Sequence, residues 1–182
     1  AKGKTGNELF KEIHKIISRN TRSQTYENAR ILIFSSMDNI KVGEQQGLWE
    51  YYSQILIPGK GGDGHKYKEK GDINGDGTPD DVINCEHTWP QSFFNKKQPM
   101  VSDMHHLFPV FSVPNNRRSD RSFGYSYPKI IYTTQSGSRL SIKPKREGFS
   151  PDLPEDFSAE LPEEIEAAYD FIFEPSDKQK GN

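Results

Sequence analysis

Two short segments in the middle of the sequence carry side chains that can do chemistry. Residues 85–87 read Cys-Glu-His and residues 103–106 read Asp-Met-His-His, so three of the five histidines fall within 20 residues. A carboxylate can bind a metal ion, and an imidazole can take up a proton near neutral pH. The adjacency of Glu86 and His87 therefore makes this part of the chain the candidate site.

Two chemistries would use Cys85. A zinc site would combine it with His87, His105 and His106, because thiolate and imidazole suit that ion, but the spacing matches no compact zinc pattern. A nucleophilic thiolate at Cys85 is the other alternative, and nothing in the surrounding residues favours a low thiol pKa. A buried structural thiol is the simpler interpretation of Cys85.

Hydrolysis of a phosphodiester is a third chemistry that residues of this region could perform. It needs an activated water, charge neutralisation at the phosphate and a proton for the leaving oxygen. Mg²⁺ prefers oxygen ligands and keeps several waters, so one carboxylate and one amide carbonyl suffice from the protein. Glu86, His87 and an asparagine on a following helix would meet these needs. Because neighbours on a strand point to opposite faces, Glu86 and His87 can serve one site only if the backbone twists or the strand ends there, and Pro90 favours an ending.

The elements that must position these residues are predicted from periodicity and turn signals. A capping box from Thr5 to Glu8 predicts the start of the first helix. Residues 25–37 have helical periodicity, although a β-branched run leaves a strand open as an alternative. The expected helices lie near 5–19, 25–37, 114–122 and 161–172, and the expected strands near 48–52, 81–86, 103–110, 130–134 and 140–143. The fold class is α+β, a mixed helical domain with a central β-sheet.

Length and composition bound the class of protein. The chain has 182 residues, of which 32% are hydrophobic, and we expect one domain over 1–182. No stretch reaches the roughly 20 apolar residues that span a bilayer, and we expect no membrane partner and no obligate protein partner. Cys85 is the single cysteine, so no intrachain disulfide can form and the cysteine count does not identify a compartment.

The net charge of −2 argues against a nucleic-acid partner only superficially. Residues 152–182 hold ten acidic residues against two lysines, which leaves 22 basic against 16 acidic residues in 1–151. The basic clusters lie in the half that contains the candidate chemistry. This asymmetry is compatible with a polyanionic substrate.

Residues 72–81 have the oxygen donors and the central glycine of a calcium loop, but Ile83 stands where an EF-hand has its bidentate glutamate. The candidate ligands of a structural Ca²⁺ are Asp72, Asn74, Asp76, Thr78, Asp80 and Asp81. A plain acidic turn and a catalytic role are the alternatives. A calcium-dependent binding module without enzymatic activity is the main rival function.

Three motifs together resemble a known family. Residues 86–92 (EHTWPQS), 103–109 (DMHHLFP) and 115–119 (NNRRS) occur in the order and spacing of the endonuclease I family of bacterial nucleases. The resemblance covers most of residues 7–182 and implies a ββα-metal, or His-Me finger, motif over about 81–122. Family members usually continue into another helix beyond residue 182, so the C-terminal end is expected to be incomplete.

The resemblance also implies roles for individual residues. His87 would be the general base, and Glu86 and Asn115 would bind Mg²⁺ or Mn²⁺, with Asn116 as the neighbour most easily confused with Asn115. Arg118 would contact phosphate, and a salt bridge to an acidic residue is its alternative role.

The two adjacent histidines of the second motif have other implied roles. His105 would brace the motif. His106 would orient the asparagine or a backbone group.

The function implied is non-specific, metal-dependent cleavage of DNA, and often RNA, to 5′-phosphate and 3′-hydroxyl ends. Contacts to the phosphate backbone position a substrate without reading its bases, which accounts for the lack of sequence preference. The family also implies a secreted or periplasmic location.

Overall fold

The computed structural model of the chain describes residues 2–19, 22–59, 83–148, 153 and 161–177. Within these residues the α-helices are α1 (Gly6–Ile17), α2 (Tyr26–Leu32), α3 (Ser112–Arg118) and α4 (Glu163–Ala168). A π-helical turn, Ile33–Met37, extends α2, and three 3₁₀ turns are formed by Gln91–Phe94, Met100–Ser102 and Met104–His106. No helix in the described part of the chain is long and apolar enough to cross a membrane.

In the part of the chain that the structure describes, the strands form three small antiparallel sheets. The first sheet contains β1 (Asn39–Val42), β2 (Gln45–Glu50) and β3 (Ile55–Pro58), and the central pair contains β4 (Ile83–His87) and β5 (Leu107–Phe111). The C-terminal sheet contains β6 (Lys129–Thr133), β7 (Arg139–Pro144) and β8 (Tyr169–Glu174). The expected α+β class is confirmed, with three small sheets in place of one central sheet.

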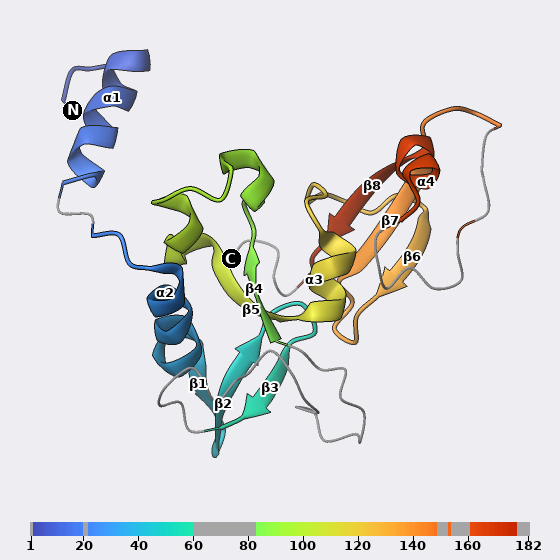
Figure 1. Cartoon of the computed structure of the whole chain (residues 1–182), viewed down its shortest axis with the longest axis horizontal. Coiled ribbons are helices and arrows are strands. Elements are labelled where there is room, and N and C mark those ends of the chain that lie inside the picture. Colours follow the sequence, from blue (N-terminus) through green and yellow to red (C-terminus); the bar gives the residue numbers. More distant parts are fainter. Residues whose placement is uncertain (1, 20–21, 60–82, 149–152, 154–160, 178–182) are drawn as a thin grey trace.

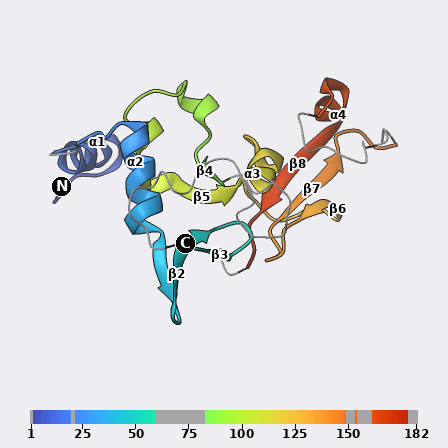
Figure 2. The same cartoon turned by 60° about the horizontal axis from the view of Figure 1, so that its bottom comes forward.

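Figure 1 shows how these parts are arranged. The first sheet with α2 lies on one side of the central pair, and the C-terminal sheet with α4 lies on the other. The turned view in Figure 2 keeps this order. Helix α3 follows β5 directly, so residues 83–118 have the β, β, α order that the sequence predicts. The candidate site therefore lies between two flanking parts.

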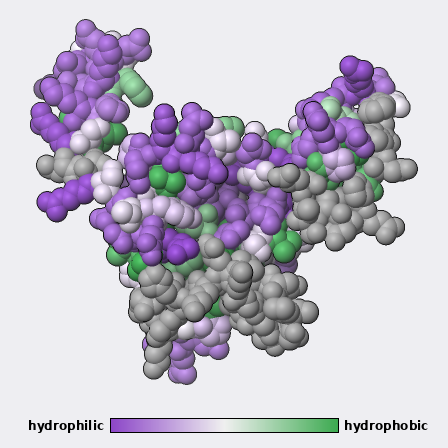
Figure 3. All heavy atoms as spheres, viewed as in Figure 1, coloured by the Kyte–Doolittle hydropathy of each residue, from purple (hydrophilic) through white to green (hydrophobic). Residues whose placement is uncertain are grey.

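Helix α1 confirms the first predicted helix but not its cap. Thr5 is the N-cap residue, yet its side chain makes no capping hydrogen bond, so the predicted capping box is wrong. None of the helix residues is buried, and Phe10 is among its exposed apolar side chains. Figure 3 shows the helix projecting from the rest of the molecule.

The strand alternative for residues 25–37 is wrong, because α2 and the π-helical turn occupy them. Thr25 caps α2 by accepting a hydrogen bond from the backbone N–H of Asn28 at 3.1 Å. Ala29, Ile33 and Phe34 are buried against the first sheet and the central pair. The helical period of this segment thus places its apolar face in the core.

The first sheet depends on a close approach of two backbones. Gly47 pairs with Pro58 across β2 and β3, and a Cβ added at Gly47 would lie 2.2 Å from the carbonyl oxygen of Ile57. Only a residue without a side chain fits there. The strand predicted over 48–52 begins earlier, at Gln45, and ends at Glu50.

Tertiary pairing changes two other predicted elements. The strand expected over 103–110 begins only at Leu107, because the Asp103 side chain accepts a hydrogen bond from the N–H of His105 and caps a 3₁₀ turn. The helix expected over 161–172 ends at Ala168, and Tyr169–Glu174 pairs with β7 as β8. Its helical spacing therefore gave a wrong prediction for 169–172.

The turn after β2 joins all three sheets. The fully buried carboxylate of Glu50 accepts hydrogen bonds from the backbone N–H groups of Tyr52, Ser53 and Phe111, and Phe111 ends β5. The backbone carbonyl of Tyr52 accepts hydrogen bonds from three hydroxyl groups of the β6–β7 connection, those of Thr134, Ser136 and Ser138. Residues 50–53 thus tie the first sheet to the central pair and to the C-terminal sheet.

This arrangement predicts a large stability effect at Glu50. Glu50→Ala leaves three backbone donors without their acceptor in the interior, so we expect the free energy of unfolding to fall by about 3 kcal/mol. Urea unfolding followed by circular dichroism measures it. The matched control is Glu44→Ala in the exposed β1–β2 turn, for which we expect a change within about 0.5 kcal/mol. Equal effects of the two substitutions would contradict this role of Glu50.

Candidate active site

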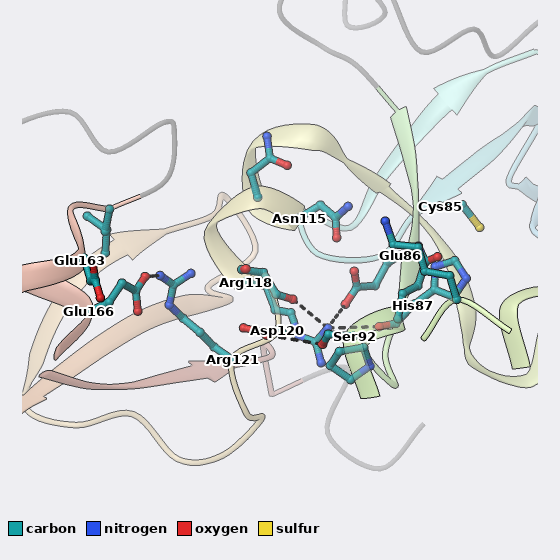
Figure 4. Close-up of a pocket in the computed structure, with 16 residues that line it drawn as sticks. Cys85, Glu86, His87, Ser92, Asn115, Arg118, Asp120, Arg121, Glu163 and Glu166 are labelled. Atoms are coloured by element: carbon teal, nitrogen blue, oxygen red, sulfur yellow. Dashed lines mark hydrogen bonds and ion pairs between the residues drawn. The ribbon is translucent and has the colours of Figure 1, made fainter. Parts of the chain in front are cut away.

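A cavity of about 1200 Å³ opens between the end of β4, helix α3 and helix α4 (Figure 4). Its walls come from segments far apart in the sequence. The lining residues are Cys85, Glu86, His87, Pro90, Gln91, Ser92, Lys96, Asn115, Asn116, Arg118, Ser119, Asp120, Arg121, Leu161, Glu163 and Glu166. Four residues predicted for the site, Glu86, His87, Asn115 and Arg118, are among them. The candidate calcium ligands at 72–81 lie outside the described residues.

The end of β4 brings Glu86 and His87 to the cavity together. They pair with Phe108 and Leu107 in the antiparallel register, and β4 ends at His87. The N–H of Thr88 then donates a hydrogen bond to the carbonyl of His106 at 3.0 Å. The strand thus ends at His87, and both adjacent residues are part of the lining of one cavity.

Glu86 is a buried carboxylate with two strong partners. Its Oε1 accepts a hydrogen bond from the hydroxyl of Tyr52 at 2.8 Å and lies 3.0 Å from Nη1 of Arg118. Burial raises the pKa of Glu86, while the charge of Arg118, the Tyr52 hydroxyl and the N–H of His87 act in the opposite direction. Burial also raises the pKa of Tyr52 far above its usual range, so its phenol remains a donor.

Arg118 holds this end of the central pair in place. Its side chain is buried, and besides the Glu86 ion pair it donates hydrogen bonds to the backbone carbonyls of His87 and Thr88 at 3.1 and 2.8 Å. Its guanidinium also lies 4.4 Å from the ring centroid of Phe123. Of the two roles considered from the sequence, the ion pair to an acidic residue is the contact observed.

His87 is enclosed by aromatic rings. Its ring centroid lies 5.5 Å from that of Tyr26 and 5.6 Å from that of His106. Burial lowers the pKa of His87, the nearby His106 lowers it further, and the backbone carbonyls of Val101 and Cys85 raise it. The neutral imidazole is thereby favoured at neutral pH.

One turn orients both histidines. Nε2 of His87 lies 3.1 Å from the carbonyl oxygen of Val101, and Nε2 of His106 lies 2.8 Å from that of Met100. Each neutral ring therefore carries its hydrogen on Nε2 and keeps its lone pair on Nδ1. His106 contacts a backbone group, which is one of the two roles expected from the resemblance.

Asn115 projects from α3 toward Glu86 in Figure 4. It is half-buried, whereas the neighbouring Asn116 is exposed, although both line the cavity. One carboxylate and one amide thus face the same space from β4 and α3. Oxygen donors of these two kinds are those that Mg²⁺ accepts.

The alternatives that use Cys85 do not fit the geometry. Burial raises the pKa of the Cys85 thiol to about 12, so it is protonated at neutral pH and packs in the core. His105 is exposed and contacts Asp103. Among the described residues, no three His, Cys, Asp or Glu side chains gather as a metal-binding group.

The far wall of the cavity is acidic and comes from α4. Glu163 and Glu166 line it, and Glu166 forms an ion pair with Arg121, which lies beyond α3 (Figure 4). The guanidinium of Arg121 also lies 4.5 Å from the ring centroid of Phe171 in β8. Arg121 is thus held by the C-terminal part of the chain.

Sequence reasoning missed two residues that contact the candidate site. Tyr52 is 34 residues from Glu86 in sequence, and Val101 contributes only its backbone carbonyl. A tyrosine in a strand-like segment and a valine in a turn give no sequence signal for these contacts. Both positions are defined by tertiary contacts alone.

The buried pair of Glu86 and Arg118 predicts strong energetic coupling. Arg118→Met leaves a buried carboxylate without its counter-charge and should lower the free energy of unfolding by about 3–5 kcal/mol. The double variant Glu86→Gln/Arg118→Met should lose less than the sum of the two single variants, by at least about 1 kcal/mol. Urea unfolding of the four proteins measures this coupling, and additive losses would refute it.

Comparison with known families gives one match that spans nearly the whole chain. The family model described as endonuclease I matches residues 5–182, which include Glu86, His87, Asn115 and Arg118. No curated protein and no solved structure matches the chain. The family's activity implies a hydrolase whose substrate is nucleic acid. The chain belongs to the endonuclease I family of nucleases.

Proposed function

We propose that the protein is a non-specific endonuclease that uses one divalent metal ion to hydrolyse phosphodiester bonds in DNA, and also in RNA. The observation that carries the proposal is the convergence of Glu86, His87 and Asn115 on one cavity from β4 and α3. Family membership supports the nuclease chemistry. Among the cavity residues, Glu86 and Asn115 are suited to bind the metal ion and His87 to accept a proton.

Glu86 and Asn115 would hold the metal ion, Mg²⁺ or Mn²⁺. Tyr52 and Arg118 both contact Oε1 of Glu86, and the second carboxylate oxygen has lone pairs with which to bind a cation. A bound divalent ion would neutralise charge on the phosphate and on the leaving oxygen. Arg118 would keep the Glu86 carboxylate in position, and the phosphate contact that the resemblance implies for it stays a prediction.

His87 would act as the general base. Its Nε2–H is directed to the carbonyl of Val101, so Nδ1 is the nitrogen that accepts the proton of the attacking water. The water oxygen bonds to phosphorus as the bond to the 3′ oxygen breaks, and the leaving oxygen takes a proton from solvent. The products are a 5′-phosphate and a 3′-hydroxyl.

Two further properties follow from family membership and are part of the proposal. Phosphate-directed binding would make cleavage insensitive to sequence. A secreted or periplasmic location would bring the enzyme to nucleic acid outside the cytoplasm.

The proposal predicts metal-dependent nicking of supercoiled plasmid. We expect nicking with added Mg²⁺ or Mn²⁺, none with EDTA, and a loss of about 100-fold or more in His87→Ala, which lacks the base. The matched control is His105→Ala, an exposed histidine outside the cavity lining, which should keep its activity. Agarose gels measure the nicking rate. Full activity of His87→Ala, or activity in EDTA, would refute the proposal.

A second prediction separates the two adjacent asparagines. Asn115→Ala removes a proposed metal ligand, so the Mg²⁺ concentration for half-maximal nicking should rise by roughly 10-fold or more. Asn116→Ala is the matched control on the exposed neighbour and should leave it unchanged. Isothermal titration of each variant with Mg²⁺ in the absence of nucleic acid gives the affinity directly. A rise confined to Asn116→Ala would reverse the assignment.

A further inference from the structure

Two large aromatic side chains lie exposed beside the cavity. Trp89 is 54% exposed and Phe93 is 61% exposed, although aromatic side chains of this size are mostly buried. Their ring centroids are 5.8 Å apart and the rings are nearly perpendicular, at 82°. One ring can thus offer its face to a flat ligand while the other borders the edge of that ligand.

The backbone that carries these rings is held firmly. Thr88 lies next to Trp89, and its backbone N–H donates a hydrogen bond to the carbonyl of His106. The carbonyl of Thr88 accepts a hydrogen bond from Arg118. The N–H of Phe93 donates to the carbonyl of Pro90 at 3.0 Å. The pair is therefore a preformed platform, so binding costs little ordering.

The segment that carries the two rings also contributes to the cavity wall. Pro90, Gln91 and Ser92, which lie between Trp89 and Phe93 in sequence, line the cavity wall. His87 precedes Trp89 by two residues. A ligand on the platform can therefore extend into the site at which the phosphodiester is cut.

The charge around the platform matches a nucleic-acid strand. Residues 88–102 contain no aspartate or glutamate, and Lys96 and Lys97 are exposed just beyond Phe93. Lys96 also lines the cavity. The acidic residues Glu163 and Glu166 lie on the opposite wall, where Glu166 is paired with Arg121, and Asp120 contacts the platform segment through the Ser92 hydroxyl at 3.5 Å.

We propose that Trp89 and Phe93 stack an unpaired base of a single-stranded nucleic acid while Lys96 and Lys97 contact its phosphates. The inference rests on the proposed function and specifies its substrate class. Aromatic side chains bind single strands by stacking on the face of any base, without reading the sequence. In a duplex both faces of each base are covered by neighbouring base pairs, so the platform favours single strands and unpaired segments.

The test measures binding in EDTA, where no cleavage is needed. Fluorescence anisotropy follows a fluorescein-labelled thymidine oligonucleotide and a duplex of equal length, each titrated with protein. We expect Trp89→Ala and Phe93→Ala each to weaken binding of the single strand by roughly 5- to 100-fold and to change duplex binding less than about twofold. Phe10→Ala on α1, also an exposed aromatic at 71%, is the matched control and should bind both ligands as the wild type does.

An oligonucleotide without bases isolates the stacking contact. Wild-type protein should bind the abasic strand as weakly as the double variant Trp89→Ala/Phe93→Ala binds the normal strand, and the double variant should not distinguish the two strands. Unchanged single-strand binding in both variants, or equal losses on single strand and duplex, would overturn the proposal. Thermal unfolding midpoints equal to that of the wild type show that the variants are folded. Failure of plasmid nicking with these binding results intact would instead count against the proposed function.

Discussion

The burial of one charged group, the carboxylate of Glu86, constrains the rest of the site. A carboxylate removed from water needs a counter-charge and hydrogen bonds, and Arg118 and Tyr52 supply them at 3.0 and 2.8 Å. Arg118 comes from α3, and Tyr52 from the turn that Glu50 ties to β5. The Glu86 carboxylate therefore contacts both the helix that packs on the central strand pair, through Arg118, and the turn that joins the sheets, through Tyr52.

The same contacts prepare the site for chemistry. Arg118 also holds the carbonyls of His87 and Thr88, so one side chain fixes both the carboxylate and the backbone that bears the imidazole. The turn at Met100–Ser102 sets which nitrogen of His87 keeps its lone pair. Rigid support of this kind is what the proton-transfer role proposed for His87 would require. Glu163 and Glu166 line the cavity from α4, and Lys96 lines it from the segment that follows β4.

Much of the local structure could be predicted because its causes are local. The apolar period of 25–37 and the turn signals around 135–138 depend on neighbouring residues, and the helix and the hairpin form there. The prediction failed where distant pairing prevailed. Residues 169–172 have helical spacing, but β7 offers backbone partners and buries Tyr169, so they form a strand. The capping box at Thr5 failed because a suitable residue pair does not guarantee the hydrogen bond.

The sequence by itself determined the residue types and the order of the site: a Glu-His pair at a strand end, then a second strand, then a helix with asparagine and arginine. These features follow from motif, spacing and the periods of strand and helix. Only the tertiary structure decided what each side chain contacts. Arg118 pairs with Glu86, and Tyr52 reaches the same carboxylate from 34 residues away. The physical reason is that burial makes such partners obligatory, whereas the path of the folded chain determines which residues can be the partners.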